Sequence, residues 1–271
     1  MNHIDAHIHL YPETLMNAIY RYFEKLGWHL PLRPGVDDTI AHLRANNAEK
    51  AFLLLYSHKT GMSKDLNHWA HQLCLRHKEL VPFGCFFPDD EKPKELVRNC
   101  LVDFGFAGFK LHFNVQPYRP DDRRYFPVYR GIMEYGGGIV MHVGTFPNSG
   151  DHLGAERLLA ALQKFPKLKV MVAHMGFFQT EDFWRIMDRY PGVYLDTAFL
   201  LGNPDFFHAD SVIAATLERF PDRVVYGSDF PLICHHLGDG LDHIAKLPWD
   251  QTLKRKLMYE NANRFLAHIP E

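Results

Sequence analysis

The chain has 271 residues, of which 46% are hydrophobic, and a formal net charge of −2. This apolar content excludes a disordered protein, and the near-neutral charge provides no bulk attraction to nucleic acid or anionic membranes. The four cysteines have no paired spacing, which indicates reduced thiols (Cys74, Cys85, Cys100 and Cys234). No apolar run is long enough to span a membrane, and the first ten residues lack signal-peptide features. We therefore expect a cytoplasmic protein.

Short β-rich apolar runs alternate with longer amphipathic stretches along the whole chain. The expected strands cover residues 2–9, 50–56, 80–87, 106–112, 138–143, 167–174, 193–197 and 223–229. Expected helices between them include residues 36–47, 64–77, 92–101 and 155–165. This alternation predicts parallel βαβ units, and eight of them favour one α/β domain over residues 1–271, a (β/α)8 TIM-type barrel, regular or distorted. An open doubly wound sheet is the alternative, but no glycine-rich phosphate-binding sequence follows the first strand.

In a (β/α)8 barrel the active site lies where the strands end. Several expected strands here end on metal-competent side chains, which are His9, His112, His174 and Asp229. His142 stands one residue before the end of its strand. The following loops at 114–120, 145–150 and 200–207 are rich in Pro, Gly and aromatic residues, which predicts a substrate pocket.

The first expected strand alternates polar and apolar residues. Strand side chains alternate between faces, so we expect Ile4, Ala6 and Ile8 to face the helices and the polar residues to face the interior. His7 and His9 would then project together toward one ion. An HxH pair alone is weak support, and its position at a strand end carries the argument.

The same alternation places other candidates in the interior. A buried, unpaired charge is costly, so Lys110 and Asp229 in such positions need partners or a metal. The expected inward sets are Gly108, Lys110 and His112 on strand 4, Val140 and His142 on strand 5, Val170, Val172 and His174 on strand 6, and Val225, Gly227 and Asp229 on strand 8.

This ordered set resembles the amidohydrolase superfamily, and most of all its "amidohydrolase 2" branch of metal-dependent hydrolases. The matching features are HxH on strand 1, histidines on strands 5 and 6, aspartate in GSDFP on strand 8, and a C-terminal YENANRF segment. The resemblance implies that His7, His9, His142 and Asp229 are metal ligands. It implies that His174 is either a ligand to a second metal or an acid/base catalyst.

Lys110 decides between one metal and two. The segment FKLHF around it resembles the AKLYP of dihydroorotases, in which a carboxylated lysine bridges two ions. Alternatively, Lys110 is an ammonium that binds a substrate carboxylate beside one metal, or it forms a salt bridge inside the barrel.

The expected chemistry follows from these ligand types. Imidazoles with a carboxylate and open positions suit Zn²⁺ or Mn²⁺, and such an ion lowers the pKa of bound water toward ~7. Asp229 is placed to move the proton from water to the leaving group, while His174 or a metal polarises the carbonyl. We expect hydrolysis of a small amide, cyclic amide, lactone or ester, with no nucleic-acid or membrane partner. The choice between a monomer and a homodimer stays open.

Three other functions compete with hydrolysis. A nonoxidative decarboxylase, similar to the aminocarboxymuconate-semialdehyde decarboxylases, would keep a one-metal site, and a lysine that can carboxylate argues mildly against it. A DNase of this superfamily would usually carry glutamate where this chain has Lys110. A noncatalytic binding barrel would not need His7, His9 and Asp229 to converge.

Several further residues have weaker claims. The arginines after strand 4 could hold an anion, but a solvated loop is favoured (Arg119, Arg123 and Arg124). A helix start is favoured over metal binding for Cys234, His235 and His236. Asp196 and Thr197 end strand 7, where support of the metal ligands or contact with the substrate is as consistent with the sequence as simple capping.

Overall fold

The structure, a computed structural model, describes residues 2–206 and 208–267. Within these ranges eight strands form one sheet in the order β1 to β8, and each strand pairs in parallel with the next. The strands are β1 (His3–Ile8), β2 (Ala48–Leu54), β3 (Leu80–Cys85), β4 (Gly108–His112), β5 (Gly138–His142), β6 (Val170–Val172), β7 (Val193–Asp196) and β8 (Val224–Val225).

Hydrogen bonds between β1 and the segment that follows β8 join the two ends of the sheet. Ala6 N donates to Tyr226 O at 2.9 Å, and His9 N donates to Phe230 O at 2.9 Å. Ile8 also forms a parallel bridge with Phe230. The predicted (β/α)8 barrel is therefore confirmed.

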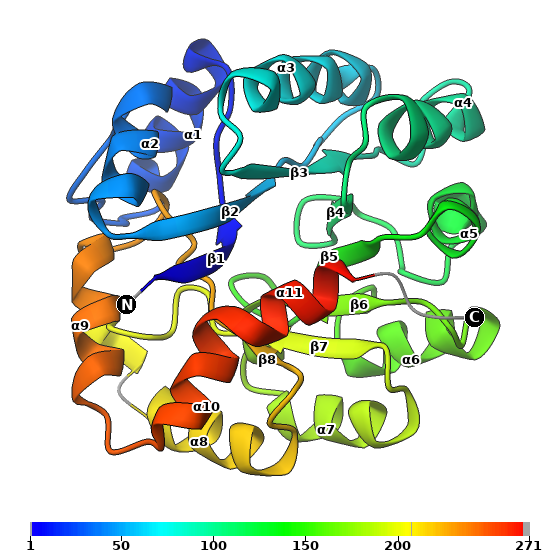
Figure 1. The fold of residues 1–271 in the computed structure, drawn as a ribbon. Helices are drawn as coiled ribbons and strands as arrows, with labels where there is room; N and C mark the ends of the chain where they lie inside the picture. Colours follow the sequence, from blue (N-terminus) through cyan, green and yellow to red (C-terminus); the bar gives the residue numbers. More distant parts are fainter. Residues whose placement is uncertain (1, 207, 268–271) are drawn as a thin grey trace.

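Helices surround the barrel (Figure 1). The helices expected at 36–47, 64–77, 92–101 and 155–165 are α2, α3, α4 and α6, with ends that differ by a few residues. Within the described ranges no helix is both long and apolar enough to cross a membrane. The helices are α1 (Glu13–Lys25), α2 (Val36–Ala45), α3 (Met62–Arg76), α4 (Pro93–Arg98), α5 (Phe126–Tyr135), α6 (Ala155–Lys164), α7 (Thr180–Arg189), α8 (Ala209–Arg219), α9 (Leu237–Lys246), α10 (Gln251–Arg255) and α11 (Asn261–Leu266).

Local sequence signals explain where several helices begin. Pro93 opens α4, where its missing N–H is no loss because the first helical N–H groups have no partner within the helix. At the start of α9, His236 and Asp239 form a capping box, in which each side chain accepts from the other residue's backbone N–H. The helix start predicted for the segment from Cys234 to His236 is therefore confirmed, with His236 as the N-cap of α9.

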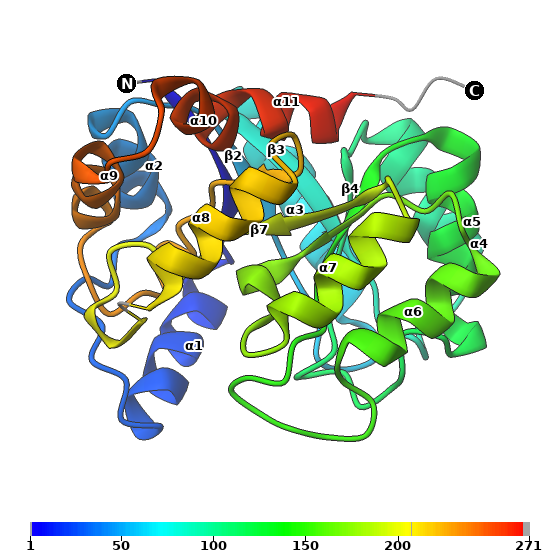
Figure 2. The same cartoon turned by 90° about the horizontal axis from the view of Figure 1, so that it is seen from below.

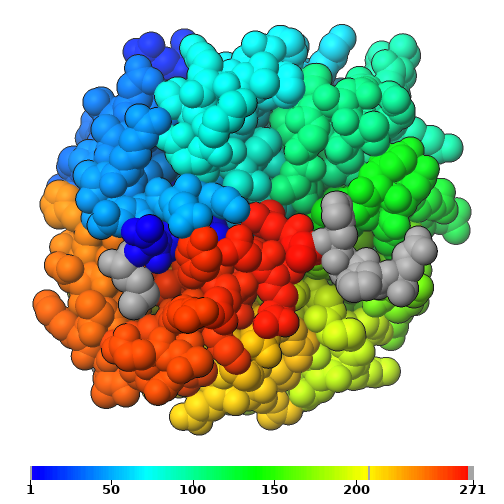
Figure 3. All heavy atoms as spheres, in the orientation of Figure 1, coloured from blue at the N-terminus to red at the C-terminus, as the bar shows by residue number. Residues whose placement is uncertain are grey.

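A compact apolar cluster fills the N-terminal end of the barrel interior. The helix α11 lies across this end, opposite α1 (Figures 1 and 2), and α10 and α11 cover the centre of this face in Figure 3. Gly138 leaves room for the Phe265 ring of α11, since a Cβ at Gly138 would lie 2.5 Å from it. The cluster contains Ile4, Ala6, Phe52, Leu54, Phe83, Val140, Met171, Tyr194, Val225, Ala262 and Phe265. The opposite end, where the strands finish, is therefore the one available for a site.

The predicted inward face of β1 is wrong in its first half. Ile4 and Ala6 belong to the interior cluster rather than to the layer against the helices. The pairing with β2 then shifts register before Ile8, which packs in the outer layer as predicted. In a regular strand Ala6 and His7 would face opposite sides. Because of this shift, Ala6, His7 and His9 all point inward.

The prediction for β6 is also wrong, because the strand ends at Val172 and its faces are reversed. Met171 joins the interior cluster, whereas Val170 and Val172 pack in the outer layer. His174 reaches the interior through a left-handed turn, with φ of 56° at His174 and 54° at Met175. Strict alternation could not predict this route.

Candidate active site

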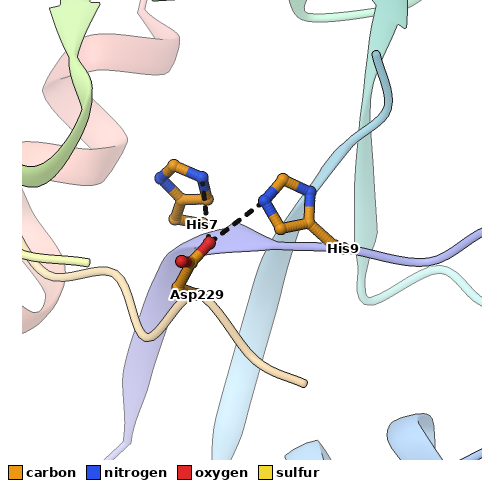
Figure 4. Close-up of side chains that lie close together, drawn as sticks. All are labelled: His7, His9 and Asp229. Atoms are coloured by element: carbon orange, nitrogen blue, oxygen red, sulfur yellow. Dashed lines mark ion pairs between the residues drawn. The ribbon is translucent and has the colours of Figure 1, made fainter. Parts of the chain in front are cut away.

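Three predicted ligands converge at the end of β1 (Figure 4). His9 Nε2 lies 3.0 Å from Asp229 Oδ1, and His7 Nε2 lies 3.4 Å from the same oxygen. Asp229 has a φ of 72°, a conformation that Asp and Asn tolerate better than most residues, and its N–H donates to His7 O at 2.8 Å. Backbone geometry therefore fixes this carboxylate beside the two imidazoles.

The other ring nitrogen of each imidazole contacts a hydrogen-bond acceptor. His9 Nδ1 lies 2.7 Å from Leu54 O, and His7 Nδ1 lies 2.8 Å from Asp196 Oδ2. We therefore assign the ring hydrogens to Nδ1, which leaves a lone pair on each Nε2 facing Asp229. The three ligand atoms lie within 4.8 Å of one another. All three ligand atoms are therefore acceptors. A divalent cation fits between them in place of a hydrogen-bond donor.

A second pair of imidazoles lies next to this group. His142 Nε2 is 2.8 Å from Phe146 O, and His174 Nδ1 is 3.0 Å from Ala198 O, so each carbonyl fixes a ring hydrogen. The unprotonated nitrogens then face each other, with His142 Nδ1 3.2 Å from His174 Nε2. In this tautomer His174 Nε2 can bind a metal or accept a proton, but it cannot donate a hydrogen bond to a substrate carbonyl. The predicted polarising role of His174 would therefore need an added proton.

Burial keeps these imidazoles neutral. It lowers the pKa of His142 to about 3, with a further contribution from the charge of Lys110. It also lowers the pKa of His174 well below the usual value, with help from His142, and that of His7, with help from Lys110. Neutral imidazole is the form that binds metals.

Lys110 lies beneath the histidines and is completely buried. Its Nζ is 3.1 Å from His7 Nε2, and within the described chain no ion pair joins it to a carboxylate. Burial lowers the pKa of Lys110 to about 8, opposed by the charges of Asp196 and Asp229. An ammonium here would repel a cation bound to the same His7 nitrogen.

Asp196, at the end of β7, links the two groups of histidines. Its Oδ2 contacts His7 Nδ1, while its Oδ1 accepts from His174 N at 2.8 Å and from Ala198 N at 3.1 Å. The same carboxylate therefore orients the His7 ring and holds the left-handed turn that delivers His174. His7, His174 and Asp196 form a second group whose potential ligand atoms lie within 4.8 Å of one another.

The site opens into a pocket of about 690 Å³. One end carries the polar groups, the rest of the wall is largely apolar, and no lysine or arginine is among the lining residues. The polar end includes His9, Tyr56, His112, Asn114, His142, Asn148, His174 and Asp229, and the apolar wall includes Leu15, Ile19, Phe23, Trp28, Phe146, Phe177, Phe199 and Leu232. The arrangement can hold an apolar molecule with one reactive polar group.

Comparison with known families agrees with the family resemblance seen in the sequence. The model of a family described as amidohydrolase matches residues 4–267. The chain belongs to the amidohydrolase family. The resemblance predicted from the strand-end residues is thereby confirmed, and the comparison with curated proteins gives no match.

Solved structures similar to this amidohydrolase share its fold. An uncharacterized TIM-barrel protein from Bordetella bronchiseptica is 20% identical, with a TM-score of 0.73 and 98% of each chain covered. A 5-carboxyvanillate decarboxylase from Sphingomonas paucimobilis is 13% identical, with a TM-score of 0.71 and 99% of each chain covered. A dihydroxybenzoic acid decarboxylase from Polaromonas sp. JS666, with bound manganese and 2-nitroresorcinol, is 18% identical, with a TM-score of 0.73. That alignment covers 98% of this chain and 97% of the other.

His112 lies on the pocket wall of the amidohydrolase. Its ring stacks on His142 with centroids 4.1 Å apart, and it contacts Tyr56 with centroids 4.5 Å apart. Its Nδ1 is buried and has no hydrogen-bond partner among residues 2–206 and 208–267. His112 therefore contributes an aromatic ring to the polar end of the pocket.

Two of the three predicted loops contribute to the pocket. Residues 114–115 and 146–148 line it, whereas the third loop supplies Phe206, which packs on Phe146 and Phe177. Residue 207, the last of that loop, lies outside the described residues. Arg119 and Arg124 pair with nearby aspartates away from the pocket, as expected of a solvated loop. Arg123 is not among the lining residues either.

The pocket wall that α1 provides was not predicted from the sequence. Five residues of α1 and its C-cap Leu26 line the pocket at spacings of three and four residues, which is the signal that could have identified it (Leu15, Ala18, Ile19, Tyr22, Phe23 and Leu26).

Replacing Asp196 with Asn should lower metal affinity by about 10–100-fold while the protein stays folded. The amide is similar in size but removes the negative charge that holds the His7 ring and fixes its tautomer. Competition with a chelator measures the change. Asp210→Asn, which removes a 2.8 Å pair with His243 between α8 and α9, is the matched control and should leave metal affinity unchanged. Equal affinity in Asp196→Asn and the wild type would contradict the orienting role.

Proposed function

We propose that this amidohydrolase is a metal-dependent hydrolase of a small amide, cyclic amide, lactone or ester. The observation that supports this most is the convergence of His7 Nε2, His9 Nε2 and Asp229 Oδ1 at the polar end of the pocket. The ligand types suit Zn²⁺ or Mn²⁺, and the similar dihydroxybenzoic acid decarboxylase binds manganese.

Different side chains have different roles in the proposed hydrolysis. A divalent cation, when bound, acidifies water and polarises an acyl oxygen. Asp229 lies on the pocket wall, where it can take the proton from the attacking water and pass it to the leaving group. His174 Nε2 is an unprotonated acceptor close by and is the second group able to hold that proton. The apolar walls limit the water that competes with the substrate.

We also propose that Lys110 is carboxylated. Three features support this: Lys110 has no carboxylate partner among the described residues, it does not line the pocket, and it touches the nitrogen that His7 would offer to a cation. Because Lys110 does not line the pocket, the structure argues against a role in binding a substrate carboxylate. The lack of a carboxylate partner among the described residues argues against a salt bridge. Addition of CO₂ to the neutral amine forms an N–C bond with loss of a proton, and the product is anionic. Its charge then attracts a cation where an ammonium would repel one.

A nonoxidative decarboxylase is the second candidate. The aromatic side chains Phe146, Phe177 and Phe199 line the pocket, and two of the similar structures are decarboxylases named for aromatic acids. In that reaction the C–C bond to the carboxylate breaks, CO₂ leaves, and a proton takes its place on carbon. Asp229 or His174, after taking up a proton from solvent water, would deliver it.

A single substrate panel separates the two reactions. Protein loaded with Zn²⁺ or Mn²⁺ is incubated with aryl esters, lactones and anilides, and separately with hydroxybenzoic acids. We expect release of a new carboxylic acid from the first set and no CO₂ from the second. Evolution of CO₂ from the second set without hydrolysis of the first would establish the decarboxylase. Turnover of neither set by metal-loaded protein would favour a binding function.

A further inference from the structure

The helix α1 presents an apolar stripe to the pocket. The stripe extends from Leu15 to Leu26, about 16 Å along the helix at 1.5 Å per residue. Figure 2 shows α1 at the end of the barrel opposite α11, which is the end where the strands finish. The stripe consists of Leu15, Ala18, Ile19, Tyr22, Phe23 and Leu26.

Only part of this stripe attaches α1 to the barrel: Leu15, Ile19 and Phe23 are half-buried and pack against the core. Met16 and Tyr20 on a neighbouring face are buried in the core, and the Tyr20 hydroxyl donates to Pro34 O at 2.9 Å. By contrast, Tyr22 is 58% exposed and Leu26 is 53% exposed, although both are large and apolar. A continuous apolar surface left in water usually marks a binding site. The stripe is therefore available to a ligand.

The stripe and the candidate catalytic residues line the same cavity. A single ligand in this volume of about 690 Å³ can contact α1 and the group formed by His9, His174 and Asp229. The cavity lies within the usual size range for small-molecule sites, and none of the described residues that line it is a lysine or arginine. An extension bearing phosphate or carboxylate would find no counter-charge on this wall. The part of the ligand along α1 must therefore be neutral.

We infer that the natural substrate carries an alkyl or acyl chain that lies along the α1 stripe while its carbonyl group lies at the histidine and aspartate residues. The inference rests on the proposed function for the identity of the reacting group. The chain-binding wall, which is the α1 stripe, is inferred independently from the residues that line the pocket. A single-ring substrate would leave most of the stripe uncovered. An apolar chain covers it and removes Tyr22 and Leu26 from water.

Calorimetric titration of the metal-loaded protein with straight-chain carboxylates, from acetate to decanoate, tests the inference without any turnover. Each added methylene that reaches the stripe should lower Kd about fourfold, as expected for burial of one CH₂. Tyr22→Asn and Leu26→Asn should each weaken decanoate binding about fivefold and leave acetate binding unchanged. Both positions are more than half exposed, so the fold should tolerate the substitutions.

Controls on the same helix make the result specific. Arg21→Ala and Asn17→Ala change exposed residues that do not line the pocket and should not alter the dependence on chain length. The same Kd for acetate and decanoate, or benzoate binding as tightly as decanoate, would overturn the inference. Chain-dependent binding without hydrolysis would refute only the proposed reaction. Hydrolysis of short acyl compounds without chain-dependent binding would refute only the chain-binding wall.

Discussion

Asp229→Asn should lower kcat by at least ~10²-fold without unfolding the protein, because the amide cannot accept the proton of the attacking water. Asn is the appropriate replacement here, since the φ of 72° at this position is one that Asn adopts readily and most other residues do not. The hydrogen bond from the backbone N–H of residue 229 to His7 O should also persist. The geometry of the site is thus kept while the base is removed.

The measurement requires metal-saturated protein, because the amide is also a weaker ligand than the carboxylate. Metal content and circular dichroism should be matched between Asp229→Asn and the wild type before kcat is compared. Asp210→Asn serves again as a control for loss of a carboxylate elsewhere. Near-wild-type turnover by a fully metallated Asp229→Asn variant would remove the base role from Asp229. His174, whose Nε2 is an unprotonated acceptor, would then be the first alternative.

The sequence was sufficient for the barrel and for most of the polar side chains at its open end. Period-two alternation located β4 and β5, so the inward placement of Lys110 and His142 followed directly. These two predictions succeeded because the backbone of each strand stays regular up to its functional residue. Asp229 was placed inward by the same alternation, but β8 ends at Val225 and Asp229 reaches the site with a φ of 72°. Strand order also brought His7 and His9 next to Asp229, since β1 adjoins the segment after β8.

The errors arose where the backbone departs from regular strand geometry. A register shift on β1 and left-handed residues at His174 and Met175 change which way the next side chain points. The shift on β1 has no glycine or proline that would reveal it in the sequence, and Gly176, which follows the turn, does not by itself predict left-handed geometry at the two residues before it. The role of Asp196 was left open for a different reason. Its contacts to His7 and His174 join residues from three strands, and only the packed barrel brings them together.

The surroundings of Lys110 bear on whether it is carboxylated, binds the substrate as an ammonium, or forms a salt bridge. A buried ammonium 3.1 Å from His7 Nε2 and a cation bound to that nitrogen would repel each other strongly in a site of low polarity. Metal binding therefore requires Lys110 to be neutral, displaced or carboxylated. Only carboxylation also supplies ligand oxygens, which would let the facing nitrogens of His142 and His174 hold a second ion.

Lys110→Met should reduce the metal content from about two ions per chain to about one, because the carbamate oxygens that a two-metal site needs are lost. Methionine has a similar volume and no charge, so the variant leaves neither a large cavity nor an unpaired ion. Elemental analysis gives the stoichiometry, and a carbon-13 carbamate signal should appear in the wild type after growth with labelled bicarbonate and be absent in the variant. Short carboxylic acids should partly restore the activity of Lys110→Ala.

Lys169→Met is the matched control for this experiment, since Lys169 is also buried but donates to Phe265 O at 3.0 Å at the closed end of the barrel. Its substitution should affect stability and leave both the metal content and the carbamate signal unchanged. A wild type with a single ion, together with a Lys110→Met variant that binds the ion more tightly, would show the amine competing with the cation for His7. That result would rule out the carbamate and, by leaving one metal in an aromatic-lined pocket, would favour the decarboxylase.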